Sequence, residues 1–108
     1  MTILFFFGWV EGEQILGICG FEEHPDKIEI HLTAIDDVSR GKGIGKKMIR
    51  TLVTAYQKSI EAETDDDAVD FYRKCGFVVT AFKHPIKGKR WTCILQCAMM
   101  EVCNERKY

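Results

Sequence analysis

The chain has 108 residues, 46% of them hydrophobic and 29% charged, so we expect one soluble globular domain over residues 1–108. Its net charge of −1 provides no general attraction to nucleic acid or to an anionic membrane. Its five cysteines form no CxxC pair, which argues against a disulfide framework or a zinc site and favours a reduced, cytoplasmic protein.

The first third of the chain predicts three strands. Residues 2–10 are rich in Phe and Ile, are too few to span a bilayer and lack the basic start of a signal peptide, so we expect a buried strand. A second strand over residues 15–22 completes a hairpin. In a third strand, residues 28–35, apolar residues alternate with a set that should share the opposite face: Glu29, His31, Thr33 and Ile35.

A glycine-rich segment, residues 40–45, opens the first predicted helix, which extends to Tyr56. Glycines at a helix start leave backbone N–H groups uncovered, and the helix dipole adds partial positive charge there. Such a place binds anions, most often phosphate. Lys42, Lys46 and Lys47 cluster at this end, where the dipole disfavours them unless an anion docks; the alternative is a solvated lysine face.

The second half of the chain adds a helix and three strands. We predict a strand at 59–63, a helix at 68–74, and strands at 77–83 and 90–99. Thr64 and the acidic run 65–67 suit the start of that helix, and Gly76 suits its end. The order β-β-β-α-β-α-β-β predicts an α+β fold with a mixed, mostly antiparallel sheet flanked by two helices.

The glycine-rich segment fails the two commonest phosphate-binding patterns. It is not a P-loop, because Arg40 stands at the first glycine position and Lys47 at the Ser/Thr position. It is not the dinucleotide GxGxxG motif, because Lys46 occupies the third glycine position. It does match Arg-x-x-Gly-x-Gly, with Arg40, Gly43 and Gly45, between a strand and a helix.

With this motif the chain resembles the GNAT superfamily of acetyl-CoA-dependent N-acetyltransferases. Residues 68–77, AVDFYRKCGF, resemble the family's A-x-x-F-Y-x-x-x-G-F motif, and the two motifs occur in the family's order. The resemblance covers roughly Thr2 to Gln96. It implies transfer of the acetyl group of acetyl-CoA directly to an amine, without a covalent enzyme intermediate. The alternative is a non-catalytic coenzyme A-binding sensor or scaffold module.

The resemblance also assigns a site for coenzyme A. The pyrophosphate would lie beside Arg40 on the backbone amides of six residues: Gly41, Lys42, Gly43, Ile44, Gly45 and Lys46. The pantetheine arm would pair with backbone groups of the third strand: Thr33, Ala34 and Ile35. One of these N–H groups would stabilise the oxyanion. Asp65, where Asn is usual, and Ala68 complete the expected contacts. The acidic run has no supporting metal-ligand pattern, so no metal is expected.

Three residues are catalytic candidates. Tyr72 matches the family tyrosine that protonates the departing thiolate, the alternative being a packing role between helix and sheet. Glu29 precedes Ile35 by six residues and His31 precedes it by four. Members of the family carry a general base at these spacings, so either residue could take the amine proton, directly or through water. The alternative for both is an ordinary strand residue. His24 and His84 lie in predicted turns and carry no signal.

The acceptor side departs from the family. Members usually begin with a strand and two helices that form one wall of the acceptor pocket, whereas this chain starts almost at the hairpin. The pocket could be open to a large or protein amine, a homodimer could supply the wall, or the chain could be shortened. The sequence does not identify the amine, and it indicates neither nucleic acid nor a membrane as partner.

Overall fold

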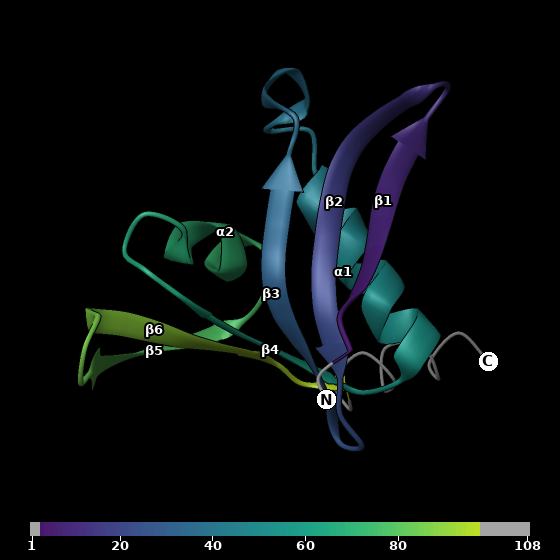
Figure 1. Ribbon diagram of the computed structural model, residues 1–108. Helices are drawn as coiled ribbons and strands as arrows, with labels where there is room; N and C mark the ends of the chain where they lie inside the picture. Colours follow the sequence, from purple (N-terminus) through teal and green to yellow (C-terminus); the bar gives the residue numbers. More distant parts are fainter. Residues whose placement is uncertain (1–2, 98–108) are drawn as a thin grey trace.

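A computed structural model describes residues 3–97 of the chain and confirms the α+β fold (Figure 1). Its elements, in chain order, are β1 (Phe5–Glu11), β2 (Gln14–Glu23), β3 (Lys27–Ile35), the 3-10 turn η1 (Asp37–Ser39), α1 (Ile44–Tyr56), β4 (Ser59–Thr64), α2 (Val69–Lys74), β5 (Val78–His84) and β6 (Gly88–Leu95). The predicted order of strands and helices is therefore correct. The last strand ends at Leu95, earlier than predicted, and residues 98 and 99 lie outside the described part.

The six strands form one sheet in the order β1-β2-β3-β4-β6-β5. Neighbouring strands are antiparallel except β3 and β4, which run parallel. That parallel pairing ends at Ile30 opposite Ala62, although β3 continues to Ile35 and β4 to Thr64. Figure 1 shows the two halves of the sheet diverging from this point, with α2 beside the opening. The far part of β3 thus has an edge that β4 does not cover.

A β-bulge changes which way the end of β3 faces. Phe21 pairs with Ile30 and the next residue of β2, Gly20, pairs with Leu32, so His31 is an extra residue with no partner across the ladder. Beyond such a residue the inward and outward positions exchange. Thr33 therefore lies on the same face as Ile30 and pairs with buried Cys19, while Leu32 is 48% exposed. The strict alternation predicted over residues 28–35 is wrong beyond His31.

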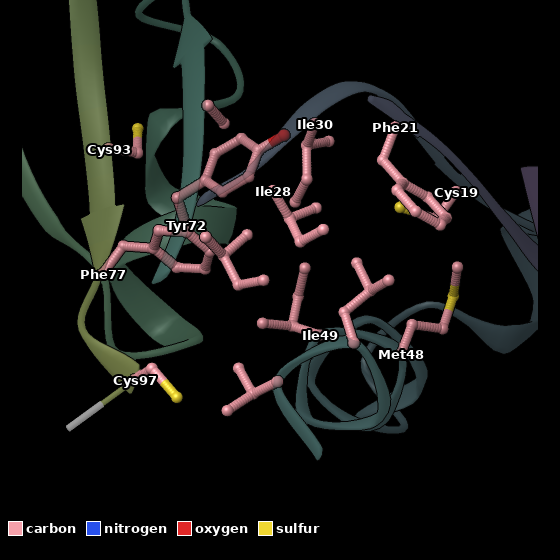
Figure 2. Packing of buried hydrophobic residues seen from close by; sticks show 14 of the residues in the cluster. Cys19, Phe21, Ile28, Ile30, Met48, Ile49, Tyr72, Phe77, Cys93 and Cys97 are labelled. Carbon is pink, nitrogen blue, oxygen red and sulfur yellow. The ribbon is translucent and has the colours of Figure 1, made fainter. Parts of the chain in front are cut away.

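The hydrophobic core lies between α1 and the inner face of the sheet (Figure 2). The helix buries one face at helical spacing, with Ile44, Met48, Ile49, Leu52 and Val53. It packs so closely on β2 that a Cβ atom at Gly17 would lie 2.6 Å from Sδ of Met48. Among the described residues, no helix is both long and apolar enough to cross a bilayer.

Candidate functional site

Two glycines shape the loop between β3 and α1. Gly41 has φ of 82° and Gly43 has φ of 79°, a left-handed conformation that costs other residues energy. A Cβ atom at either position would meet nothing within 4 Å, so the backbone is open above both residues. Gly43 is the N-cap of α1, and no side chain caps the helix there. The N–H groups of the first turn are therefore available to an anion, as the sequence predicts.

Gly45 serves a different purpose from the other two glycines. It lies inside α1, and a Cβ atom there would be 2.6 Å from Cζ of Phe71 and closer still to Cε1. The absence of a side chain lets the Phe71 ring sit directly on the start of α1. The first sequence motif thus contacts the second, and this contact fixes the position of α2.

Basic side chains surround the loop. Arg40 donates from Nε to the carbonyl oxygen of Ile35 at 3.4 Å and pairs with Asp37 at 3.2 Å, so it ties the loop to the end of β3. Lys42, Lys46 and Lys47 are exposed, and within residues 3–97 no ion pair involves them. Their positive charge is therefore not neutralised by neighbouring side chains.

A hollow of about 930 Å³ lies on the hairpin side of the loop. It is lined by residues from the end of β1, the start of β2, the loop and α1, namely Glu11, Gln14, Ile15, Leu16, Asp36, Val38, Ser39, Lys42, Ile44 and Lys47. Only Lys42 and Ile44 belong to the predicted cofactor contacts. The hollow therefore adjoins the glycine-rich loop without including the diverging part of β3 and β4.

The second motif folds into a helix with a Schellman C-terminus. The N–H of Phe77 donates to the carbonyl of Tyr72 at 3.0 Å and that of Gly76 to Arg73 at 3.0 Å, with Gly76 at φ of 95°. The rings of Phe77 and Tyr72 pack edge to face with centroids 5.2 Å apart. Phe71 touches Tyr72 in the same way at 5.1 Å. Tyr72 is therefore held on both sides.

The start of α2 is also fixed by a motif residue. Asp65 accepts hydrogen bonds at Oδ1 from the N–H groups of Asp67 and Ala68, at 3.1 and 3.0 Å. The helix itself begins at Val69, one residue later than predicted, because Asp65 holds the residues before it in a turn. One oxygen of Asp65 is thus engaged in shaping the backbone at the predicted pantetheine contact.

Tyr72 is 7% exposed and lies beside the diverging part of β3. Figure 2 shows its ring pointing from α2 toward Ile30. Burial raises the pKa of Tyr72, so the hydroxyl is protonated at neutral pH. The nearby Thr33 hydroxyl opposes this rise in the pKa, although the two hydroxyls do not form a hydrogen bond. Within the described chain, Thr33 Oγ1 is buried without any hydrogen-bond partner.

The cysteines near Tyr72 are not activated. Burial raises the pKa of Cys19 to about 11 and that of Cys93 to about 11, and it also raises the pKa of Cys75. A thiol with a raised pKa is a poor source of thiolate at neutral pH. These three residues therefore offer no nucleophile for a covalent acyl intermediate.

Glu29 and His31 lie on the outer face of the sheet, away from α1, and the structure adds two partners there. His24 Nε2 is 2.9 Å from Glu29 Oε1, and His31 Nε2 is 3.1 Å from Glu22 Oε1. A carboxylate that holds one ring nitrogen fixes the orientation of a histidine base. Neither Glu22 nor His24 was predicted as a site residue. The cross-strand pairing of Glu22 with Glu29 is the signal that would have placed them together.

The fold places an uncapped helix start, open to an anion, beside a strand edge that has no partner on the β4 side. The Acetyltransferase (GNAT) family matches residues 2–77, and the chain therefore belongs to the GNAT acetyltransferase family. No curated protein matches the sequence.

Solved structures share this fold at low identity. An aminoglycoside 6′-N-acetyltransferase complexed with coenzyme A is 13% identical with a TM-score of 0.71, over 87% of this chain and 73% of that one. A Bacillus subtilis acetyltransferase in complex with CoA is 20% identical with a TM-score of 0.66, over 84% and 75%. The Escherichia coli ribosomal-protein-S18-alanine N-acetyltransferase is 14% identical with a TM-score of 0.67, over 87% and 69%.

Proposed function

We propose that this protein is an N-acetyltransferase that binds acetyl-CoA where β3 and β4 diverge. The observation that carries the proposal is the edge of β3 beyond Ile30, which has no partner strand on the β4 side. Thr33, Ala34 and Ile35 lie on this part of the strand, where backbone groups on the β4 side would meet the amides of a pantetheine arm, although the Ile35 carbonyl already accepts from Arg40. Two proteins with the same fold are complexed with coenzyme A, which supports this choice of donor.

The residues present fit such a donor at both of its ends. The open backbone at Gly41 and Gly43, with uncapped N–H groups at the start of α1, suits a pyrophosphate. The buried and unpartnered Thr33 hydroxyl suits a polar group of the acyl-bearing end. Lys42, Lys46 and Lys47 supply positive charge for the remaining phosphate.

The chemistry follows from the two faces of β3. In this proposal, the amine nitrogen attacks the thioester carbon, and a backbone N–H near Thr33 stabilises the developing oxyanion. The carbon–sulfur bond then breaks, and Tyr72 on the inner face protonates the departing thiolate. Glu29 or His31 on the outer face accepts the proton from the amine. A ternary complex suffices, because the described thiols near Tyr72 are not poised as nucleophiles.

The assignment of the base is tested by comparing Glu29→Gln with His31→Gln. We expect the variant that lacks the base to lose about 100-fold in kcat, at the low end of general-base effects because the second group remains nearby. The lost rate should return as pH rises, since more of the amine is then already deprotonated. The measurement is a pH–rate profile of thiol release for each variant. If both variants keep full kcat, neither residue is the base.

The donor site is tested by Thr33→Val. This change removes the buried hydroxyl and keeps the shape of the side chain, so we expect the Kd for acetyl-CoA to rise about 2- to 10-fold, the worth of one hydrogen bond. The unliganded protein should not lose stability in urea, because the hydroxyl has no partner there. The matched control is Thr80→Val, an exposed threonine on β5. Unchanged affinity would remove Thr33 from the donor site.

The activity itself is tested by release of free coenzyme A from acetyl-CoA in the presence of polyamines, aminoglycosides, amino acids and lysine peptides. Amine-dependent thiol release supports the enzyme. Tight binding of acetyl-CoA, measured by calorimetry, without turnover on any amine would instead favour a non-catalytic coenzyme A-binding module.

A further inference from the structure

Four side chains with metal-binding atoms meet on the outer face of β2 and β3. Glu22 comes from β2, His24 from the turn after it, and Glu29 and His31 from β3. The strand register places Glu22 directly opposite Glu29, and the bulge at His31 brings that side chain toward Glu22. All four side chains remain partly open to solvent.

Three side chains of this cluster, Glu22, His24 and Glu29, each offer one ligand atom, and these three atoms lie within 4.8 Å of one another. His24 Nε2 lies 2.9 Å from Glu29 Oε1 and 3.5 Å from Glu22 Oε2. His31 Nε2 lies 3.1 Å from Glu22 Oε1 and 3.8 Å from Glu29 Oε2. Tetrahedral zinc, with bonds of about 2.0–2.1 Å, separates its ligand atoms by about 3.3 Å. His31 meets the other oxygens of the two carboxylates, so its ring would have to rotate to join the first three residues as a fourth ligand.

Charge provides a second and independent reason to place a cation here. Two carboxylates directly opposite each other on neighbouring strands repel. Among the described residues, Glu22 and Glu29 form ion pairs only with the two histidines. The lysines on neighbouring positions pair elsewhere, Lys58 with Glu23 at 2.7 Å and Lys27 with Glu61 at 3.4 Å. Within residues 3–97, no lysine or arginine therefore forms an ion pair with these two carboxylates.

We propose that Glu22, His24, Glu29 and His31 form a zinc-binding site. Two imidazoles with two carboxylates suit Zn²⁺, whereas Mg²⁺ and Ca²⁺ prefer oxygen ligands alone. The site lies outside the coenzyme A loop, and its existence does not depend on the proposed acetyltransferase activity. If that activity is also correct, the metal and the acceptor amine compete for Glu29 and His31. Zinc would then inhibit transfer without displacing acetyl-CoA.

The test is a titration of the full, reduced chain without a histidine tag, using Zn²⁺ in competition with a chromophoric chelator. We expect one equivalent to bind. His24→Ala should weaken binding by at least about 100-fold, because even loss of a group that only supports a ligand costs up to that much. Glu22→Gln should weaken it too while keeping the side-chain shape. His84→Ala is the matched control, because His84 lies at the end of β5 outside the cluster.

The absorption spectrum of bound Co²⁺ distinguishes metal binding at this site from metal binding by the cysteines. Co²⁺ bound by nitrogen and oxygen should give visible d–d bands without the near-ultraviolet charge-transfer band of a cobalt–thiolate bond. Circular dichroism confirms that each variant is folded. The proposal is overturned if the wild-type chain binds no Zn²⁺, if folded His24→Ala and Glu22→Gln bind as tightly as wild type, or if the cobalt spectrum shows thiolate ligation.

Discussion

Replacement of Tyr72 by Phe should lower kcat for acetyl transfer about 100- to 10,000-fold, the usual range for loss of a general acid. The ring would stay packed between Phe71 and Phe77, because the substitution removes only the hydroxyl. The Kd for acetyl-CoA should therefore remain close to that of the wild type. Stopped-flow thiol release and calorimetry with acetyl-CoA measure the two quantities separately.

The pH dependence sharpens this prediction. Burial raises the pKa of Tyr72 above its ordinary value, so the hydroxyl holds its proton through neutral and moderately alkaline pH. Any loss of activity due to ionisation of Tyr72 should therefore appear only above about pH 10. Tyr56→Phe is the matched control, a half-buried tyrosine of α1 that packs on Phe21. If Tyr72→Phe turns over as fast as this control, Tyr72 is a packing residue.

Replacement of Gly45 by Ala should destabilise the protein by about 1–3 kcal/mol, the usual cost of overpacking. The new methyl group would overlap the Phe71 ring and push α2 away from α1. Urea unfolding, followed by circular dichroism, measures the free energy of unfolding. The companion change Phe71→Leu should restore part of the loss in the double variant, because it removes the ring atoms that the methyl group meets.

Gly43→Ala is the matched control for this prediction. It is a glycine at φ of 79° with nothing within 4 Å of its Cβ position, so its cost should be about 1–2 kcal/mol of backbone strain. Phe71→Leu should not relieve that strain. If Phe71→Leu combines with Gly45→Ala and with Gly43→Ala in a purely additive way, then the contact between the two motifs does not constrain Gly45.

The parts of the site that short-range rules govern could be predicted from the sequence. The helix start at the glycines and the end of α2 at Gly76 depend on residues within one helical turn. The shape of the glycine-rich loop and the order of elements were therefore predictable. The sequence also placed Gly45 in the loop motif. It did not show that Gly45 faces Phe71, because that contact joins two helices separated by a strand.

The parts that depend on strand register could not be predicted. On β3 itself no glycine or proline marks the bulge at His31, and the glycine at the irregularity, Gly20, lies on the opposite strand, so alternation appears continuous through Ile35. Thr33 was consequently expected on the face of Glu29, although it lies beside Cys19. The sequence marks His24 only as a turn residue. Its ring nitrogen comes within 2.9 Å of the Glu29 carboxylate only through the pairing of β2 with β3.

The extra residue in β3 can be removed without turning the strand over. Deletion of His31 would restore a regular ladder in which Leu32 stays opposite Gly20 and Thr33 stays opposite Cys19. Deletion of any other single residue between Ile30 and Ile35 while His31 keeps its place in the bulge would instead shift the residues that follow it out of line with their partners on β2. Homologous sequences should therefore tolerate a one-residue gap at His31 and not elsewhere in this part of the strand.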